Sequence, residues 1–252
     1  VGLGGPNGAG KTTAIMALLG VVPFDSGSIR VLGSTPGQAM DRIGVTLDTP
    51  PRAPDWTPLQ AARCISRFHA RWDEKTFTRL LTRFEVPERT HAKDLSRGQG
   101  LKLSLALALA HDPELLVLDE PTSGIDPVAR LDILDVLRDF MVDPGHSILF
   151  STHITSDLER IADRLHVIAR GRTVFDGSLD ELGEHWAIVR APLEDLDAGA
   201  RAALVGARTT RSGTLEALVA TSDTALFPRS ALIEEVALDE AVAAFTRSTK
   251  EH

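Results

Sequence analysis

Cysteine is almost absent from this sequence: Cys64 is the only one among 252 residues. A single thiol cannot form a disulfide within the chain or build a metal site from several cysteines, so we expect a reducing compartment such as the cytoplasm. Long apolar runs are absent too. The longest candidate, residues 101–110, contains Lys102 and Ser104 and is shorter than the ~18 residues of a membrane helix. The first residues lack a charged segment followed by an apolar one, which predicts no secretory signal.

Basic residues are in the minority. The chain has 27 Lys and Arg residues and 35 Asp and Glu residues, which gives a formal net charge of −8. A protein that binds nucleic acid over a broad face needs a basic excess, so the charge argues against nucleic acid as a partner. A hydrophobic fraction of 43% and a charged fraction of 25% are typical of a soluble globular chain, and the length allows one large domain or two small ones.

Strand-like and helix-like segments alternate along most of the chain. Apolar, β-rich segments predict strands at residues 115–118, 148–150 and 167–168. A helical pattern begins behind Asp126. Residues 101–109 alternate like a strand, but they lack β-branched side chains and follow a good N-cap, Ser96, so we expect a helix. The alternation predicts an α/β fold with a parallel sheet flanked by helices.

Two regions depart from this alternation. Four prolines lie within residues 48–58, which predicts a stiff surface loop, and a helical stretch at residues 59–84 follows it. From about residue 188 the sequence contains alanine-rich stretches, with a predicted strand at 214–220 and a predicted helix at 236–246. We therefore expect residues 188–252 to form a small C-terminal α/β extension.

Residues 5–12, GPNGAGKT, fit the phosphate-loop pattern G-x-x-x-x-G-K-[ST]. The glycines let the backbone curl until successive N–H groups face a phosphate at the positive end of a helix. Lys11 then reaches the β- and γ-phosphates, and the hydroxyl of Thr12 binds Mg²⁺. A glycine-rich turn with an incidental lysine is the alternative for this segment alone. The residues expected to contact nucleotide here are Gly5, Pro6, Asn7, Gly8, Ala9, Gly10, Lys11, Thr12 and Thr13.

Two acidic residues end the predicted strand in LLVLDE, residues 115–120. Parallel α/β sheets bind ligands at the carboxyl edge of their strands, so Asp119 can join the Mg²⁺ shell and Glu120 can orient or deprotonate a water. The alternative is a strand that simply meets a polar turn. His153 follows the predicted strand at 147–152 in the same manner. A lone histidine is more often solvated or part of a core, but this position favours a catalytic role.

The segment LSRGQ, residues 95–99, opens the predicted helix that precedes LLVLDE. Ser96 followed by Gly98 gives this helix a small, polar N-terminus that suits a phosphate, and a bare capping motif is the alternative. Because residues 5–12 already account for one phosphate site, a second one suggests contact with the nucleotide of a partner.

In this order, GPNGAGKT, LSRGQ, LLVLDEP, SGID and STH resemble the ATPase subunit of ATP-binding-cassette (ABC) transporters, over residues 1–186. RWDE at 71–74 and STHITSDLERIAD at 151–163 are most similar to ATPases of ABC-2-type exporters. The resemblance implies a P-loop NTPase fold at residues 1–187 with a helical subdomain inserted at 48–112. It also implies that the chain binds and hydrolyses ATP with Mg²⁺ to drive export.

The resemblance implies a role for each matched residue. Glu120 is the expected catalytic base, and His153 is the expected switch histidine. The expected metal-side residues are Thr12, Asp119 and Asp48, the last at a position where the family has glutamine. The expected signature contacts to nucleotide, together with the residue of the dimer-contacting loop, are Ser96, Gly98, Gln99 and Asp126.

By the same resemblance, two ABC ATPase chains, identical or different, sandwich two ATP molecules. Residues 48–112 then touch an integral-membrane permease, so we expect a cytoplasmic protein on the inner face of the cell membrane. Trp56, on the proline-rich loop, is a candidate anchor for that permease. Its alternative role is that of an ordinary, partly buried loop aromatic.

The sequence departs from the family pattern at three places. The family has antiparallel strands and an adenine-stacking aromatic before the phosphate loop, whereas here the loop begins at residue 5 and tyrosine is absent. This predicts a truncated or misassigned start. Asp48 has a shorter reach than glutamine, and Arg97 stands at a glycine position of the signature.

Two other functions stay open at this point. One is an ABC-type ATPase that acts away from membranes; many of these carry two cassettes or a long coiled insertion, and neither pattern is seen here. The other is a degenerate regulatory cassette, which the presence of Lys11, Glu120 and His153 disfavours. Co-purification with a membrane partner separates the first from an exporter subunit, and an ATPase assay tests the second. The transported substrate is not encoded in these motifs.

Overall fold

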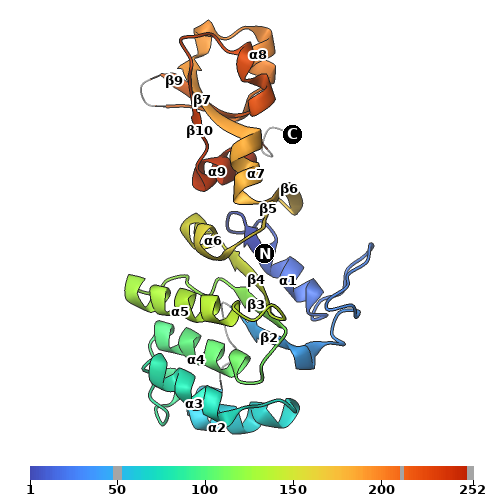
Figure 1. The fold of residues 1–252 in the computed structure, drawn as a ribbon, viewed down its shortest axis with the longest axis vertical. Helices are drawn as coiled ribbons and strands as arrows, with labels where there is room; N and C mark the ends of the chain where they lie inside the picture. Colours follow the sequence, from blue (N-terminus) through green and yellow to red (C-terminus); the bar gives the residue numbers. More distant parts are fainter. Residues whose placement is uncertain (48–52, 211–212, 249–252) are drawn as a thin grey trace. The chain divides into compact units, whose positions relative to one another are not determined.

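The computed structural model describes residues 1–47, 53–210 and 213–248 (Figure 1). The chain divides into two compact units. The first unit comprises Val1 and residues 11–161, and the second comprises residues 2–10 and 162–252. Asp48, one of the expected metal-side residues, lies outside the described residues.

The first unit is built on parallel strands. β2 (Ile43–Thr46) pairs with β3 (Leu115–Asp119), and β3 pairs with β4 (Ser147–Thr152). In this register Asp119 lies opposite Ser151, so both side chains lie near the carboxyl ends of their strands. The apolar residues in the middle of β3 are completely buried, as expected for a parallel strand that is covered on both faces.

Helices join these strands. They are α1 (Lys11–Leu18), α2 (Pro58–Ile65), α3 (Glu74–Arg83), α4 (Arg97–Leu109), α5 (Pro127–Phe140) and α6 (Thr155–Ile161), with 3₁₀ turns at Met40–Arg42, Ser66–Phe68 and Ala92–Asp94. The Ser96 hydroxyl accepts the Gln99 N–H at the start of α4, and the Gln99 side chain accepts the Ser96 N–H in return. This capping box fixes where the helix begins. Most side chains of α4 are buried, in keeping with its apolar sequence.

The second unit contains two groups of strands. In the first group, β1 (Gly2–Gly4) pairs in parallel with β5 (Leu165–Ala169). β5 pairs antiparallel with β6 (Arg172–Gly177). Helix α7 (Leu179–His185) follows, and the Ser178 hydroxyl caps its N-terminus.

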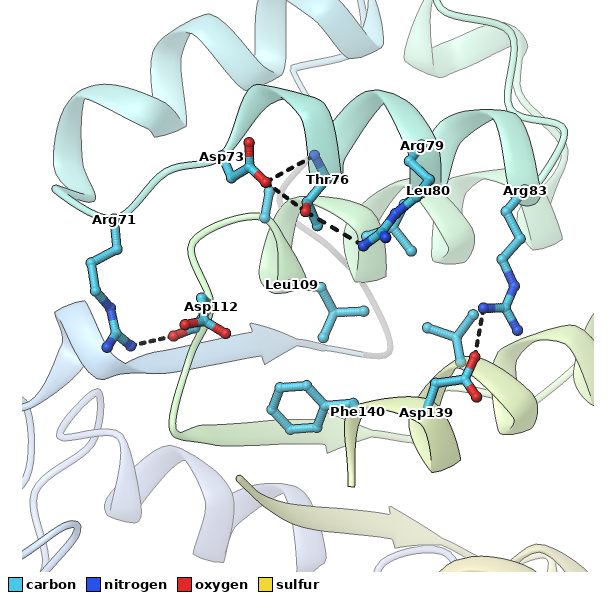
Figure 2. Close-up of a pocket in the computed structure, with 12 residues that line it drawn as sticks. Arg71, Asp73, Thr76, Arg79, Leu80, Arg83, Leu109, Asp112, Asp139 and Phe140 are labelled. Atoms are coloured by element: carbon cyan, nitrogen blue, oxygen red, sulfur yellow. Dashed lines mark hydrogen bonds and ion pairs between the residues drawn. The ribbon is translucent and has the colours of Figure 1, made fainter. Parts of the chain in front are cut away.

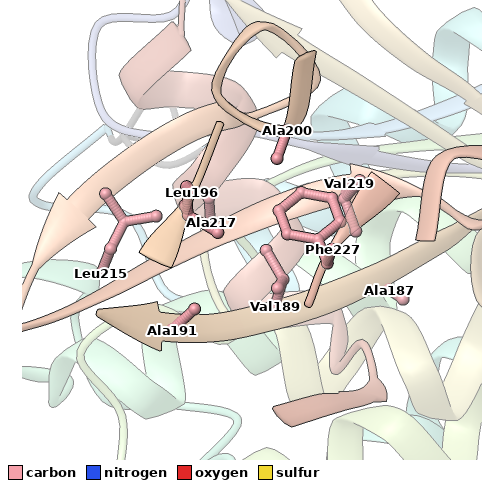
Figure 3. Packing of buried hydrophobic residues seen from close by; sticks show 9 residues of the cluster. All are labelled: Ala187, Val189, Ala191, Leu196, Ala200, Leu215, Ala217, Val219 and Phe227. Atoms are coloured by element: carbon pink, nitrogen blue, oxygen red, sulfur yellow. The ribbon is translucent and has the colours of Figure 1, made fainter. Parts of the chain in front are cut away.

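The second group is an antiparallel sheet in the order β10-β7-β9-β8. Its strands and the helical segments around it are β7 (Trp186–Pro192), β8 (Val205–Thr209), β9 (Thr214–Ala220), β10 (Leu232–Glu235), α8 (Ala198–Ala202), α9 (Leu238–Ser248) and 3₁₀ turns at Leu193–Asp195 and Thr221–Leu226. Alternate residues of β7 and β9 point to one side and pack with Leu196, Ala200 and Phe227 in a buried cluster (Figure 3). The ring of Trp186 meets that of Phe245, on α9, edge-on, with centroids 5.2 Å apart.

The structure confirms the predicted α/β architecture, including the C-terminal α/β extension. The segments predicted as strands lie in β3, β4, β5 and β9, and the helices predicted at residues 101–109, behind Asp126 and at 236–246 lie in α4, α5 and α9. The helical stretch at 59–84 is interrupted, because α2 ends at Ile65 and α3 begins only at Glu74. Asp73 restarts the helix by accepting the N–H groups of Lys75 and Thr76. No helix in the described ranges is long and apolar enough to cross a membrane.

Candidate functional site

Residues 5–10 form a tight turn that leads from β1 directly into α1. Its glycines have positive φ values, +144° at Gly5, +77° at Gly8 and +109° at Gly10, which L side chains rarely adopt. Gly5 has no room for a side chain in any case, since a Cβ there would lie 2.2 Å from the carbonyl oxygen of Ile168. The backbone therefore has the curled form that a phosphate loop requires at the start of a helix.

Lys11 and Thr12, the first residues of α1, reach the acidic end of β3. Lys11 Nζ lies 3.4 Å from Glu120 Oε1, and the Lys11 side chain is only 6% exposed. Thr12 Oγ1 donates to Asp119 Oδ2 at 2.7 Å. Ser151, on β4, donates its hydroxyl to the other oxygen of Asp119. The structure thus brings the expected phosphate-binding lysine, the expected metal-side hydroxyl and both acids into one cluster.

Glu120 has an uncommon backbone conformation, and several hydrogen bonds hold it. Its φ is +51°, in the left-handed region that non-glycine residues seldom occupy. Its N–H donates to the carbonyl of Ser151 at 3.0 Å, and its own carbonyl accepts the Ser123 N–H at 3.2 Å. His153 Nδ1 lies 2.8 Å from Glu120 Oε2, opposite the oxygen that faces Lys11. Backbone strain of this kind gathers at functional sites, where the surrounding structure holds it.

The signature segment forms a second cluster. Ser96 and Gln99 bond each other in the capping box of α4. A Cβ on Gly98 would lie 3.6 Å from the side chain of Ile125, and a Cβ on Gly124 would lie 3.3 Å from the guanidinium of Arg97. The N-terminus of α4 therefore packs against the turn at residues 123–126. The signature residues thus contact this turn and form one cluster, and Lys11 and Glu120 belong to another.

Asp126 ends that turn and caps α5. Its Oδ1 accepts the N–H groups of Val128 at 3.1 Å and Ala129 at 2.9 Å. The hydrogen bond from Ala129, supported by the one from Val128, lowers the pKa of Asp126 below its ordinary value. A charged carboxylate at the N-terminus of a helix is also stabilised by the helix dipole.

A pocket of about 590 Å³ lies between α3, the C-terminal end of α4 and α5 (Figure 2). An ion pair of 2.7 Å between Arg83 and Asp139 links α3 to α5 there. The Thr76 hydroxyl donates to Asp73, which lowers the pKa of that carboxyl group. None of the residues that line the pocket belongs to the predicted nucleotide site, so we assign it no part in nucleotide binding.

Two adjoining hollows lie between α2, α4 and β2. One, of about 250 Å³, is lined by Trp56, and the other, of about 470 Å³, by Phe68. Both hollows share Ile65, Ser104 and Leu107 in their walls. Trp56 is 41% exposed and Phe68 is 76% exposed. We call these two hollows together the α2–α4 groove.

Two histidines stack at the wall of the α2–α4 groove. The rings of His69 and His111 lie 3.8 Å apart, centroid to centroid. His111 is 2% exposed, and its Nε2 lies 3.3 Å from the carbonyl oxygen of Ile43. Burial, followed by the neighbouring His69, lowers the pKa of His111 to about 4. His111 is therefore neutral in the folded chain at physiological pH.

Two further residues near the cluster, Ser151 and Asp157, are not predicted from the motifs. Ser151 is completely buried and holds Asp119, and Asp157 is completely buried on α6, four residues after His153. Ser151 is the first residue of the STH motif, near the end of a predicted strand. Its position next to a strand that ends in two acids could have indicated that it contacts one of them. A polar residue at a buried helix position gives no such signal, because its partners lie far away in the sequence.

Comparison with known proteins gives a consistent result. Residues 1–123 match the family model described as ABC transporter. The chain is 39% identical over 186 residues to the Nod factor export ATP-binding protein I of Burkholderia orbicola (strain AU 1054), which covers 70% of this chain and 61% of that relative. It is 40% identical over 191 residues to the protein of the same name from Sinorhizobium fredii (strain NBRC 101917 / NGR234), over 70% of this chain and 54% of the relative. These matches support the identification of the chain as an ABC transporter ATPase.

Solved structures from the ABC family have a similar fold. One, titled as the ATP binding subunit of an ABC transporter, aligns with a TM-score of 0.65 and 27% identity, over 72% of this chain and 79% of that one. A second, cbiO1 from Clostridium perfringens, aligns with a TM-score of 0.59 and 23% identity, over 72% of this chain and 77% of that one. The ABC relatives from Burkholderia and Sinorhizobium are longer, since this chain spans 61% and 54% of their lengths.

Proposed function

We propose that this ABC chain binds and hydrolyses ATP as the nucleotide-binding subunit of an exporter. The observation that carries the proposal is the cluster at the end of β3, where Lys11 faces Glu120, Thr12 bonds Asp119 and His153 bonds Glu120. The names of the Burkholderia and Sinorhizobium relatives, which refer to export and to ATP binding, support the same function.

ATP binding rests on the residues of the phosphate loop. Residues 5–10 present backbone N–H groups to the phosphates, and Lys11 adds a positive charge. The Thr12 hydroxyl and the Asp119 carboxylate are oxygen ligands that suit Mg²⁺, which neutralises phosphate charge when bound. No group of three or more His, Cys, Asp or Glu residues that could hold a metal occurs in the described part of the chain. Phosphate oxygens and water would therefore complete the Mg²⁺ shell.

Hydrolysis rests on Glu120 and His153. Lys11 Nζ lies 3.4 Å from Glu120 Oε1, so the lysine that binds the phosphates stands beside the proposed base. Glu120 then accepts a proton from the water whose oxygen attacks the γ-phosphorus, while the bond from that phosphorus to the bridging oxygen of ADP breaks. His153 holds the second oxygen of Glu120 at 2.8 Å and so fixes the direction of the carboxylate.

A pair of such chains completes the proposed site. The signature cluster of Ser96, Gly98 and Gln99 is built separately from the cluster of Lys11 and Glu120. The N-terminus of α4 suits a phosphate, so we infer that it contacts the nucleotide held by a second ABC ATPase chain. Asp126, at the end of the adjoining turn, belongs to the same contact surface.

The other proposed partner is an integral-membrane permease. The α2–α4 groove offers an apolar surface, and Phe68 and Trp56 stand exposed on it. Exposed aromatic side chains beside a groove are frequent anchors of protein interfaces. Docking there would hold the chain on the cytoplasmic face of the cell membrane.

Calorimetric titration with ATP and with AMP, both with Mg²⁺, tests the proposed function. We expect ATP to bind at least ~100-fold more tightly than AMP, because Lys11 and the phosphate loop act on phosphates that AMP lacks. Release of phosphate from ATP should require Mg²⁺. Equal affinity for the two nucleotides, or no binding of either, would contradict the proposal.

We predict that Phe68→Ala weakens association with the co-expressed permease at least ~10-fold, because interface aromatics commonly contribute ~2 kcal/mol or more. Pull-down from detergent extracts at graded concentrations measures this. Val142→Ala, at a residue that is 81% exposed after the end of α5, is the control and should bind as the parent does. If both variants bind equally well, Phe68 is not part of the interface.

A further inference from the structure

Asp157 is a completely buried carboxylate whose oxygens are both bonded. Thr122 Oγ1 donates to its Oδ2 at 2.6 Å, and Arg130 Nε donates to its Oδ1 at 2.6 Å. A further nitrogen of Arg130 donates to the hydroxyl of Ser156 at 2.7 Å. We call Thr122, Arg130, Ser156 and Asp157 the Asp157 network.

The members of the Asp157 network come from three segments that carry predicted site residues. Thr122 follows Glu120 by two residues. Arg130 lies on α5, four residues after Asp126. Asp157 lies on α6, four residues after His153. One carboxylate therefore ties together the turn after β3, the helix that Asp126 caps and the helix that follows His153.

A network of this kind is expected to fix the positions of its segments more than to stabilise the fold. Moving the Asp157 carboxylate out of water costs free energy, and the side chain of its partner Arg130 stays 27% exposed, so this ion pair is weak evidence for a gain in stability. Hydrogen bonds that converge on one buried carboxylate do fix the relative positions of the segments that donate them. The position of Glu120 depends on such bonds, because a φ of +51° is strained for a non-glycine residue and persists only where neighbouring residues hold it.

We propose that Asp157 is a positioning residue for ATP hydrolysis. Through Thr122 it holds the turn that follows Glu120, and through α6 it holds the segment that carries His153. It thereby sets the 2.8 Å contact between His153 and Glu120 without touching the nucleotide. Arg130 Nε donates to one oxygen of Asp157, and the other oxygen accepts from Thr122. The inference rests on the proposed function, because it assigns Asp157 a task in that reaction.

The test compares Asp157→Asn with Asp132→Asn. Asp132 lies on α5, like Arg130, but pairs with Lys102 of α4 at 2.8 Å, outside the Asp157 network. We expect Asp157→Asn to lower kcat at least ~10-fold with KM for ATP within ~2-fold of the parent, and Asp132→Asn to leave both unchanged. Thr122→Val should lower kcat as well, and the conservative Thr122→Ser, which keeps the donor, should restore it.

A second measurement does not depend on hydrolysis. Imidazole ¹⁵N NMR of the nucleotide-free chain reports the hydrogen bond between His153 and Glu120. We expect its signals to shift in Asp157→Asn and to stay in place in Asp132→Asn. Equal kcat values, or unmoved His153 signals in Asp157→Asn, would overturn the inference. A parent chain that does not hydrolyse ATP would instead contradict the proposed function, and the NMR comparison would still decide the role of Asp157.

Discussion

A Glu120→Gln variant is expected to hydrolyse ATP at least ~10²-fold more slowly than the parent and to keep its ability to bind ATP. Glutamine has the same size as glutamate, so the contact to His153 can persist, but an amide does not take a proton from the attacking water. Phosphate release at saturating ATP measures kcat, and calorimetry measures binding.

The same substitution should also tighten ATP binding. The Lys11 side chain, which is 6% exposed, loses the carboxylate that lies 3.4 Å from its Nζ. Without the Glu120 charge, no carboxylate at that position competes with the phosphates of ATP for Lys11, so the lysine contributes more to nucleotide binding. Glu159→Gln, at an exposed residue of α6, makes the same chemical change away from the cluster and serves as the control. Turnover within a few-fold of the parent in Glu120→Gln would refute the assignment of the base.

Acidification should destabilise the parent chain more than a His111→Gln variant. The pKa of His111 is lowered from 6.5 to about 4 in the fold, mainly by burial. Between these two values the unfolded chain binds a proton that the folded chain does not, so the free energy of unfolding falls as the pH drops from 6.5 to 4. A shift of this size corresponds to about 3 kcal/mol of lost stability.

Denaturant unfolding over that pH range measures the effect. Glutamine does not titrate and can still donate to the Ile43 carbonyl, so the variant should lose about 3 kcal/mol less than the parent across the range. His69, stacked on His111, and Arg71 also lower its pKa and stay in place in both chains. His185→Gln, at an exposed position on α7, should keep the pH dependence of the parent. The same pH dependence in parent and His111→Gln would rule out His111 as its source.

The elements of this fold were predictable because their signals are local. Three helices start with hydrogen bonds that span only a few residues. The capping residues are Ser96 with Gln99, Ser178 with Glu181, and Asp126. Helix α4 was recognised in spite of its alternating leucines, because its composition favours a helix. The break between α2 and α3 was not predicted, although Asp73 is of a residue type that commonly occupies the N-cap of a helix.

The candidate site was predictable only in part. The motifs placed Lys11, Asp119, Glu120 and His153 at one edge of the sheet, and the structure brings them together. The Asp157 network was not predictable, since Thr122 and Asp157 are 35 residues apart and only the packing of α6 joins them. The left-handed conformation of Glu120 was equally hidden, because nothing in its residue type requires it.

The edge-on contact between Trp186 and Phe245 has a spectroscopic consequence. The chain has three tryptophans and no tyrosine, so its near-ultraviolet emission comes from indole rings. Trp56 and Trp72 belong to the first unit and Trp186 to the second. A chain that keeps Trp186 alone carries its fluorophore between β7 and α9, and a chain that keeps Trp56 alone carries it on the α2–α4 groove. The emission of Trp186 can thus report the unfolding of the C-terminal sheet. The emission of Trp56 can report the binding of a partner to the α2–α4 groove.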